Sequence, residues 1–493
     1  MGLVRSFRRA HAFSAALGHR GFQGGTMSLA KDSKKDFDFI VVGAGISGPF
    51  IAHELCKKGA SVLMLEAGPH FNRDTYPCKE IDSNSQLYWG GGIELNTDAD
   101  LGILRPKVVG GGSIVNQALV DRFDKIALDS WKDVSGADFF TQDKLAPWYD
   151  AAEAEMVIQE IPAQYRNGNA LLFKEGFEKN GFNWAPLVRA QKDCRFDDGN
   201  DCIECLSGCR IDSKQSTPVT VLKKAFELGL VLESQFEAKT VRWAPEVVTV
   251  MGVNRYGEHK AYRAKKIVLG AGAIGNSRLL LNSGFKKKLP ALGRNFYTHP
   301  QSMLIGLYER PINAHKGPLQ SLKSNDATFR ANYFKLENVF APPVAIAMLV
   351  PGLARRHLSV MKRYAHMACI EVAVRDTNPG EISVAGNGRA RIVKRLNSFD
   401  RNTQTKGFKA IHQIFKATGA REIVDGRFSI GLHLMGGLNL GTDPVRSVTS
   451  PDFNLHGFKN IYAADSSIFP NAPGINPSLT IMAISKMAAA KLK

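Results

Sequence analysis

The sequence predicts an α/β fold that is organised around a Rossmann-like βαβ unit near the amino end of its 493 residues. A continuous apolar run at 39–42 is typical of a strand buried on both faces of a parallel sheet. A G-x-G-x-x-G motif at 43–48 follows this run directly and leads into an amphipathic helix over 51–58. A second apolar run at 61–65 completes the unit. A third at 267–272, which ends in Gly-Ala-Gly, is expected to join the same parallel sheet.

The glycines of this motif have separate mechanical roles in a dinucleotide site. Gly43 permits the tight turn out of the strand, Gly45 lets a pyrophosphate approach the backbone, and Gly48 lets the helix pack closely on the strand. Glu66 ends the second apolar run, where its carboxylate would accept hydrogen bonds from a ribose diol. The order of strand, glycines, helix, strand and acid therefore predicts dinucleotide binding, and the motif alone does not separate FAD from NAD.

Composition and charge restrict the remaining classes of function. The chain is 44% hydrophobic, which suits a globular protein with a large core. Its longest apolar stretch, 339–350, is too short and too broken by proline to cross a bilayer. The formal net charge of +18 indicates either a basic surface around a dianionic cofactor or contact with a membrane surface. No zinc-finger, RRM or helix-turn-helix pattern is present, so no nucleic-acid partner is expected.

Residues 1–35 are predicted to form a basic extension outside the fold, either disordered or acting as a targeting segment. The extension has no acidic residue before Asp32, and its Arg, Ser and His content resembles an organelle transit peptide. Met27 offers a second start directly before the first strand. The expected location is cytoplasmic or peripheral to a membrane, and organelle targeting by this extension is the alternative.

Two further stretches have unusual local composition. Three glycines at 110–112, followed by Ser113, predict a second turn with exposed backbone, which would either lie against the cofactor or be an ordinary turn. Four cysteines also lie close together in the sequence: Cys194, Cys202, Cys205 and Cys209. This density is typical of a loop with free or paired thiols, of an iron–sulfur cluster or of a four-thiolate zinc site. The sequence leaves these three open, and no metal is predicted.

Residues 297–430 are expected to form a second unit, because they contain strand-length segments, scattered prolines and few glycine motifs. Within this unit the apolar stretch 339–350 precedes four basic residues, Arg355, Arg356, Lys362 and Arg363. We interpret the apolar stretch as a lid over an apolar substrate or as core. Docking of the apolar and basic segments on a membrane surface is the alternative interpretation.

The carboxyl-terminal residues add candidates for chemistry. His433 lies among small residues, and an apolar strand further on ends at Asp465. Asn476 and Pro477 open a last helix over 479–492, whose free N–H groups would face an electron-rich acceptor. Since a single histidine is more often structural than catalytic, His433 gains a catalytic role only from its context.

These motifs, in this order, resemble those of the glucose–methanol–choline (GMC) oxidoreductases, a family of FAD enzymes. The resemblance covers roughly 36–490 and rests on VVGAGISG with its acid, VVGGGSIVN, IVLGAGAIGNSRLLLNSG, GRNFYTHP and HLMGGLNLG…NIYAADSSIFPNAPGINPSLTIMA. It implies a discontinuous FAD-binding domain and an α+β substrate-binding domain with a mainly antiparallel sheet. The ranges expected are 36–125, 210–296 and 430–493 for the FAD-binding domain, and 126–209 and 297–429 for the substrate-binding domain.

The resemblance also implies a set of cofactor contacts. They are Gly43, Gly45, Gly48, Glu66, Gly111, Gly112, Ser113, Asn116, Val241, Asp465 and Pro477. In this set Val241 would contact adenine through its backbone, and Asp465 would face the ribityl-pyrophosphate region. Because no histidine occupies the loop at 110–113, we expect FAD to be bound without a covalent link. Some relatives carry an iron–sulfur cluster in a comparable cysteine loop, and the spacing here does not predict one.

The activity implied by the resemblance is alcohol oxidation with hydride transfer to flavin N5. His433 matches the family histidine over N5 and would be the general base, and Asn476 matches its partner and would hold the substrate oxygen. The stretch 339–376 resembles the long-chain alcohol oxidases, while the cysteine loop is also similar to cholesterol oxidases and FAD sugar dehydrogenases. We expect a small-molecule substrate, an apolar or long-chain alcohol, with O2, a quinone or a cytochrome as electron acceptor. The alternatives are a sugar, polyol or sterol dehydrogenase, and a non-catalytic, membrane-associated flavin-binding protein.

Overall fold

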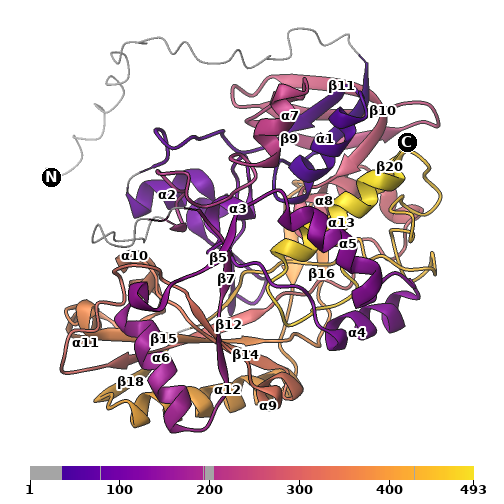
Figure 1. Cartoon of the computed structure of the whole chain (residues 1–493). Coiled ribbons are helices and arrows are strands. Elements are labelled where there is room, and N and C mark those ends of the chain that lie inside the picture. Colours follow the sequence, from indigo (N-terminus) through magenta and orange to yellow (C-terminus); the bar gives the residue numbers. More distant parts are fainter. Residues whose placement is uncertain (1–35, 78, 193, 195–204, 427, 493) are drawn as a thin grey trace, which may run out of the picture.

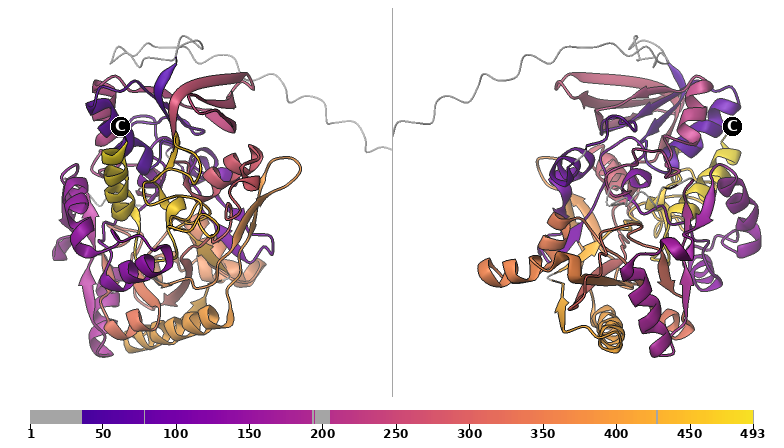
Figure 2. Two further views of the ribbon diagram at one scale, coloured as in Figure 1. Left: turned by 90° about the vertical axis from the view of Figure 1, so that its right-hand side faces the viewer. Right: turned by 60° about the vertical axis from the view of Figure 1, so that its left-hand side comes forward.

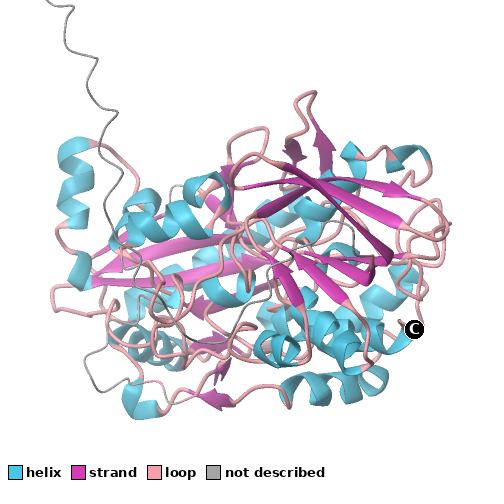
Figure 3. Cartoon of the chain, turned by 90° about the horizontal axis from the view of Figure 1, so that it is seen from above, coloured by secondary structure: helices cyan, strands magenta, loops and turns pink. Residues whose placement is uncertain are grey.

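The computed structural model describes residues 36–77, 79–192, 194, 205–426 and 428–492. Two sheets dominate the described structure, one in the upper part of Figure 1 and one in the lower part. Seen from above, helices lie around the strands of both sheets (Figure 3). This arrangement confirms the predicted α/β class.

The first sheet draws its seven strands from distant parts of the chain: β1 (Phe37–Val42), β2 (Val62–Leu65), β8 (Val231–Glu233), β9 (Phe236–Trp243), β10 (Val248–Asn254), β11 (His259–Leu269) and β20 (Ile461–Ala463). The strands β8, β2, β1, β11 and β20 pair with one another in this order, and all four pairings are parallel. The strands β9 and β10 extend the sheet in antiparallel fashion beyond β11. As predicted, the third apolar run joins the parallel sheet beside β1.

The glycine motif sets how closely the first helix approaches this sheet. The helix α1 (Ser47–Lys57) begins four residues before the predicted start, because Pro49 in the first turn needs no acceptor for an N–H group. A Cβ atom on Gly48 would lie 2.1 Å from the carbonyl oxygen of Gly43. Gly43 itself has φ +101°, and a Cβ atom there would lie 2.4 Å from the Gly270 carbonyl oxygen. Both positions therefore require glycine.

Helices from both ends of the chain cover the first sheet: α5 (Gln142–Glu153), α7 (Val221–Glu227), α8 (Gly272–Asn282) and α13 (Ser478–Lys491). The last helix, α13, packs against both α1 and α5 (Figures 1 and 2). This contact brings the carboxyl-terminal residues beside the amino-terminal glycine motif. It creates the shared site that neither segment could form alone.

The second sheet has nine strands: β3 (Glu94–Leu95), β4 (Leu101–Ile103), β6 (Trp184–Pro186), β12 (Pro300–Leu307), β13 (Leu322–Ser324), β14 (Phe334–Asn338), β15 (Met367–Val374), β18 (Glu422–Asp425) and β19 (Ser429–Gly431). All of its pairings are antiparallel except that of β4 with β19. The prediction of a mainly antiparallel second sheet is confirmed. The strands β3 and β4 come from within 36–125, the range assigned to the FAD-binding domain.

The remaining α-helices and strands are α2 (Glu80–Leu87), α3 (Gly112–Val115), α4 (Lys125–Ser135), β5 (Ile158–Glu160), α6 (Gly168–Lys179), β7 (Val188–Ala190), α9 (Ala327–Ala331), α10 (Pro343–Leu349), α11 (Ala354–Met361), β16 (Glu381–Val384), β17 (Ala390–Val393) and α12 (Ser398–Ala417). Of these, α4 contributes to the core around the first sheet, and β16 packs against α8. The helices α6 and α12 pack together against β14 and β15, and they bury a second hydrophobic core there. Within the described ranges, no helix has the length and apolar character needed to span a bilayer.

Candidate active site

One cavity extends from the carboxyl ends of the first sheet to the second sheet. At one end it is lined by Gly43, Glu66 and Gly270, the residues that follow β1, β2 and β11. At the other end it is lined by Gln301 of β12 and by Glu371 of β15. In open α/β sheets the carboxyl ends of the strands form the ligand crevice, so the predicted nucleotide site opens directly towards the second sheet.

The two glycine loops meet at the first end of this cavity. Gly45, Gly111 and Gly112 all line it, and a Cβ atom on Gly111 would lie 2.6 Å from the Cα atom of Gly45. No side chain caps the amino end of α1, whose residue Ser47 also lines the cavity. Exposed backbone and an uncapped helix start are the features that bind phosphate groups.

Two buried carboxylates hold the backbone of this end in place. The Glu66 carboxylate accepts hydrogen bonds from the backbone N–H groups of Ala44, at 2.9 Å, and Gly68, at 2.7 Å. Asp465 accepts from the backbone N–H of Gly272 at 2.7 Å and so fixes the start of α8. Each carboxylate oxygen has two acceptor positions, so Glu66 retains capacity for a ribose hydroxyl.

A pair of histidines lies towards the other end of the cavity. His433 lines the cavity wall, and its Nδ1 atom is 2.9 Å from the Nδ1 atom of His299. The Nε2 atom of His299 accepts a hydrogen bond from the backbone N–H of Gly474 at 2.9 Å. His299 follows the GRNFYT sequence directly, and Gly474 precedes the last helix, so three distant segments meet at this pair.

These contacts determine the protonation of both rings. Burial and the neighbouring His433 hold the pKa of His299 well below its usual value, so His299 is neutral. Because its Nε2 atom accepts a hydrogen bond, its single proton is on Nδ1 and is donated to Nδ1 of His433. Burial, and then the charge of Lys335, lower the pKa of His433 to about 3. The neutral His433 of the resting protein therefore carries its proton on Nε2.

Asn476 sits in a buried network of charged groups beside these histidines. Its amide nitrogen lies 3.1 Å from carboxylate oxygens of both Asp121 and Glu337, and its Oδ1 atom accepts from Lys335 at 2.9 Å. Lys335 also pairs with Glu337 at 2.7 Å. Both N–H groups of the Asn476 amide are therefore donated to carboxylates, and one acceptor position on its oxygen stays open to the cavity.

Glu371 adds a second carboxyl group to this network. It is the register partner of Glu337 across β14 and β15, so both side chains lie on the same face of the sheet and line the cavity. Burial and the charge of Glu337 raise the pKa of Glu371 well above its usual value. Two buried like charges on one face of a sheet repel each other, which favours the neutral form of Glu371.

An apolar wall faces these polar groups. It is formed by side chains of β12, α10 and the segments beside them: Met303, Val339, Phe340, Ala341, Ala345, Leu349, Ile430, Leu432 and Leu434. Few polar groups set against a largely apolar lining are typical of a small-molecule site. The wall gives the cavity room for an apolar chain beside a single polar reacting group.

Sequence profiles of known families match most of the chain. Residues 84–301 and 385–485 match the sequence profiles of the GMC oxidoreductase, and 41–90 match that of an NAD(P)-binding Rossmann-like domain. The two GMC matches together cover more than half of the chain. The protein belongs to the GMC oxidoreductase family.

Individual relatives are distant. The long-chain-alcohol oxidase FAO4B of Arabidopsis thaliana is 24% identical, over 92% of this chain and 67% of the relative. The fructose dehydrogenase large subunit of Gluconobacter japonicus is 25% identical, over 92% of this chain and 97% of the relative. Pyridoxine 4-oxidase from Mesorbium loti superposes with a TM-score of 0.68 at 17% identity, over 93% of this chain and 99% of that structure.

GMC oxidoreductases are FAD-dependent, and the cavity fits that cofactor. The two glycine loops approach each other so closely at Gly45 and Gly111 that a side chain on Gly111 would not fit, and they therefore present bare backbone to the cavity. Pro477 and Ser478 line the cavity at the start of α13, and no side chain caps this helix. The two uncapped helix starts, of α1 and α13, place partial positive charge where a phosphate and an electron-rich ring edge would lie.

The structure brings most of the predicted GMC site residues together. The cavity lining contains Gly43, Gly45, Glu66, Gly111, Gly112, Asn116, His433, Asp465, Asn476 and Pro477. It does not contain Gly48, Ser113 or Val241. The Val241 N–H is donated to the Ser283 hydroxyl at 2.8 Å, and Glu237 and Ala238 of the same strand line the cavity instead. Cys202 of the predicted cysteine cluster lies outside the described residues, so that cluster stays a prediction.

Sequence reasoning missed several groups of this GMC site. His299 belongs to a motif that supported the family resemblance, but nothing local indicated its pairing with a histidine 134 residues away. Glu371 interrupts an otherwise apolar strand, MACIEVAV, whereas Glu337 lies in the mixed strand FKLEN. A lone acid in an apolar strand is a signal for a buried functional carboxyl group, since burial of a charge needs a compensating partner.

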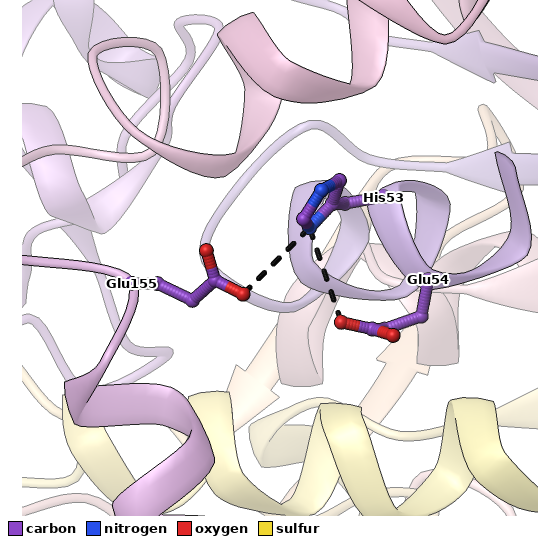
Figure 4. Close-up of side chains that lie close together, drawn as sticks. All are labelled: His53, Glu54 and Glu155. Carbon is purple, nitrogen blue, oxygen red and sulfur yellow. Dashed lines mark ion pairs between the residues drawn. The ribbon is translucent and has the colours of Figure 1, made fainter. Parts of the chain in front are cut away.

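A second cluster with the residue types of a metal site lies outside the cavity. The Nδ1 atom of His53 is 3.9 Å from oxygens of both Glu54 and Glu155 (Figure 4). The ammonium group of Lys486 binds those carboxylates at 2.8 and 2.7 Å. Lys57 also pairs with Glu54 at 3.2 Å and Lys224 with Glu155 at 2.6 Å, so the lysine charges compensate the two acids. The cluster ties α13 to α1 and to the segment after α5. It acts as an ion-pair network and needs no cation.

Proposed function

We propose that this GMC protein is an FAD-dependent oxidoreductase that oxidises the CH–OH group of an apolar or long-chain alcohol. The observation that supports this most is the position of His433, neutral and half-buried, where the nucleotide-binding end of the cavity meets the apolar wall. A hydroxyl group near His433 would have its hydrocarbon chain against that wall. The resemblance to a long-chain-alcohol oxidase supports the same substrate class.

FAD, when bound, supplies the acceptor for the hydride that leaves the alcohol carbon. The chain holds it without a covalent link, through the two glycine loops, Glu66, Asp465 and the start of α13. Glu237 and Ala238, on the same strand as the predicted Val241, line the cavity and would lie at the adenine end. The loop at 110–113 contains no histidine that could form a covalent link to the flavin.

His433 is the general base for the hydroxyl proton. The O–H group becomes strongly acidic as the hydride leaves its carbon, so a neutral imidazole of low pKa suffices to accept the proton. Acceptance at Nε2 requires that His433 first hold its own proton on Nδ1. The histidine pair must then give up the hydrogen bond from Gly474, which costs about 1–3 kcal/mol. That cost is small beside the roughly 8 kcal/mol or more by which enzymes lower their barriers.

Asn476 accepts the alcohol O–H, while the substrate binds, at the one acceptor position of its amide that the network leaves open; the same proton is then donated to His433 Nε2 when the reaction begins. Its other contacts fix it rigidly between Asp121, Glu337 and Lys335. A rigid neighbour holds the reacting carbon at near-attack distance without reorganisation. Gln301, Gln320 and the Glu337–Glu371 pair complete the polar side of the cavity.

A second candidate function is a sugar or polyol dehydrogenase that passes electrons to a quinone or a cytochrome. The resemblance to a fructose dehydrogenase subunit favours it, and so does the polar side of the cavity, which offers partners for several hydroxyl groups. The sterol dehydrogenase and the non-catalytic, membrane-associated flavin protein have no specific observation in their favour.

An anaerobic substrate screen separates these functions. The FAD-loaded protein is mixed with aliphatic, sterol and sugar alcohols, and the bleaching of the flavin absorbance is followed. We expect long aliphatic alcohols to bleach the flavin fastest. Faster bleaching by sugars would favour the second candidate, and no bleaching by any alcohol would refute both. Peroxide formed in air, compared with reduction of a quinone or cytochrome, then identifies the electron acceptor, and iron is assayed on the same sample.

A further inference from the structure

The segment from α10 to the end of α11 presents apolar side chains to solvent. Leu353 is 80% exposed, Leu358 52%, Met348 41% and Val344 36%. We call these four residues, together with Arg355, Arg356 and Lys362, the α10–α11 face. In Figure 1 and in the right-hand view of Figure 2, α11 stands out from the body of the protein. Exposed apolar side chains gathered in one short segment in this way indicate a surface that is covered in use.

The charge around these side chains has one sign. No Asp or Glu occurs between Glu337 and Glu371. Among the described residues, Arg355, Arg356 and Lys362 have no acidic partner, while Arg363 pairs with Glu422 at 2.7 Å. The nearby Glu80 accepts backbone N–H groups at the start of α10, so its charge is compensated there. A partner for this face must therefore have both an apolar interior, into which the leucines can insert, and a negatively charged surface.

The same short helix also forms part of the cavity wall. Val344 and Met348 lie one turn apart on α10 and face solvent, while the adjacent residues Ala345 and Leu349 line the cavity. Only the thickness of α10 thus separates the exposed apolar surface from the apolar wall of the site. Loosening this helix would join the two.

We propose that the α10–α11 face docks on the surface of an anionic lipid bilayer, with its leucines among the acyl chains and its basic residues at the headgroups. Exposed leucines beside arginines and lysine are the composition of an interfacial helix. A bilayer of negatively charged lipid provides both an apolar interior and a negatively charged surface. Docking in this position turns the wall of the cavity towards the membrane, from which an apolar molecule could enter. The docking itself does not depend on the proposed alcohol oxidation.

Vesicle sedimentation of the full-length, FAD-loaded protein tests this proposal. The vesicles contain either phosphatidylcholine alone or an equimolar mixture with phosphatidylglycerol. We expect at least tenfold tighter binding to the anionic vesicles, and weaker binding as salt is raised. Equal binding to both vesicles, or no binding to either, would overturn the proposal.

Two variants and a matched control locate the contact. Leu353→Ser combined with Leu358→Ser should reduce binding at least tenfold, and Arg355→Gln should reduce it about fivefold. The control Val445→Ser removes a side chain that is 68% exposed in another loop, and it should bind like the wild type. Flavin content and thermal midpoint should be unchanged in all three. Wild-type binding by the leucine variant would overturn the proposal. So would a wild-type dimer in gel filtration that this variant converts to a monomer, because the face would then cover a second copy.

Discussion

Replacement of His433 tests the proposed chemistry at a single atom. His433→Ala removes the proton acceptor, and His433→Asn also removes it while retaining an N–H donor in nearly the same place. A general base typically contributes a factor of about 10²–10⁴ to the rate. Both variants should therefore slow anaerobic flavin bleaching by a factor on the order of hundreds or more. The alanine variant also leaves the buried Nδ1–H of His299 without its acceptor, which costs about 1–3 kcal/mol of folding stability, whereas the amide oxygen of the asparagine variant can still accept it.

The assay is stopped-flow mixing of the FAD-loaded variants with a long-chain alcohol in the absence of oxygen. Flavin content should match that of the wild type, because His433 lies beyond the nucleotide end of the cavity. The matched control is His412→Ala, a histidine on α12 that pairs with Asp425 away from the cavity. This variant should bleach at the wild-type rate.

Comparison of the two variants tests whether His433 acts as a base or as a hydrogen-bond donor. If His433→Asn kept a rate close to the wild type while His433→Ala lost it, an N–H donor would be sufficient at this position. His433 would then stabilise the alcohol oxygen through the Nε2 proton that it holds in the resting protein, and the base would be another group. If both variants bleached at the wild-type rate, the imidazole would have no part in the reaction.

Three further outcomes follow from burial and close packing. Burial lowers the pKa of His433 from 6.5 to about 3, so between these pH values the unfolded chain binds a proton that the folded protein does not. The thermal midpoint should therefore fall as the pH falls from 6.5 towards 3, and more steeply than the midpoint of His433→Asn. Equal slopes for the two proteins would contradict the lowered pKa. Burial and the charge of Glu337 raise the pKa of Glu371 and favour its neutral form, so Glu371→Gln should keep the thermal midpoint of the wild type. Glu337→Gln should cost about 3–5 kcal/mol in denaturant unfolding, since it leaves the partly buried Lys335 without its carboxylate partner, and equal stability of these two glutamine variants would refute the assignment of charge. Gly48→Ala places a Cβ atom 2.1 Å from the carbonyl oxygen of Gly43 and should abolish FAD retention, measured as flavin released on denaturation. The control Gly386→Ala has open space around it and should retain FAD. Retention of FAD by Gly48→Ala would contradict the close packing of α1 on β1.

The nucleotide end of the site was predictable because its determinants are local. The turn at Gly43 and the close packing at Gly48 depend on residues within one βαβ unit, and the spacing of the motif encodes both. The antiparallel second sheet was predictable only through the family resemblance. Its strands are short and are separated by long connections, so their sequence pattern alone does not give their order.

The polar end of the site was less predictable because it is assembled from distant segments. Asn476 was expected to hold the substrate oxygen, and nothing near it in sequence indicated that Asp121, Glu337 and Lys335 engage most of its amide. The low pKa of His433 likewise results from tertiary burial. The adenine contact was hard to predict for the same reason. The alternation of residues along a strand gives the two faces of β9, but it does not give which of its residues reach the cavity.

The central claim is that FAD lies along the amino-terminal glycine turns and reaches His433 at the carboxyl-terminal end of the fold. The absorbance spectrum of the purified protein, recorded before and after anaerobic addition of a long-chain alcohol, tests it most directly. The claim predicts a flavin spectrum that the alcohol bleaches. A folded protein that is colourless and takes up no added FAD would contradict it.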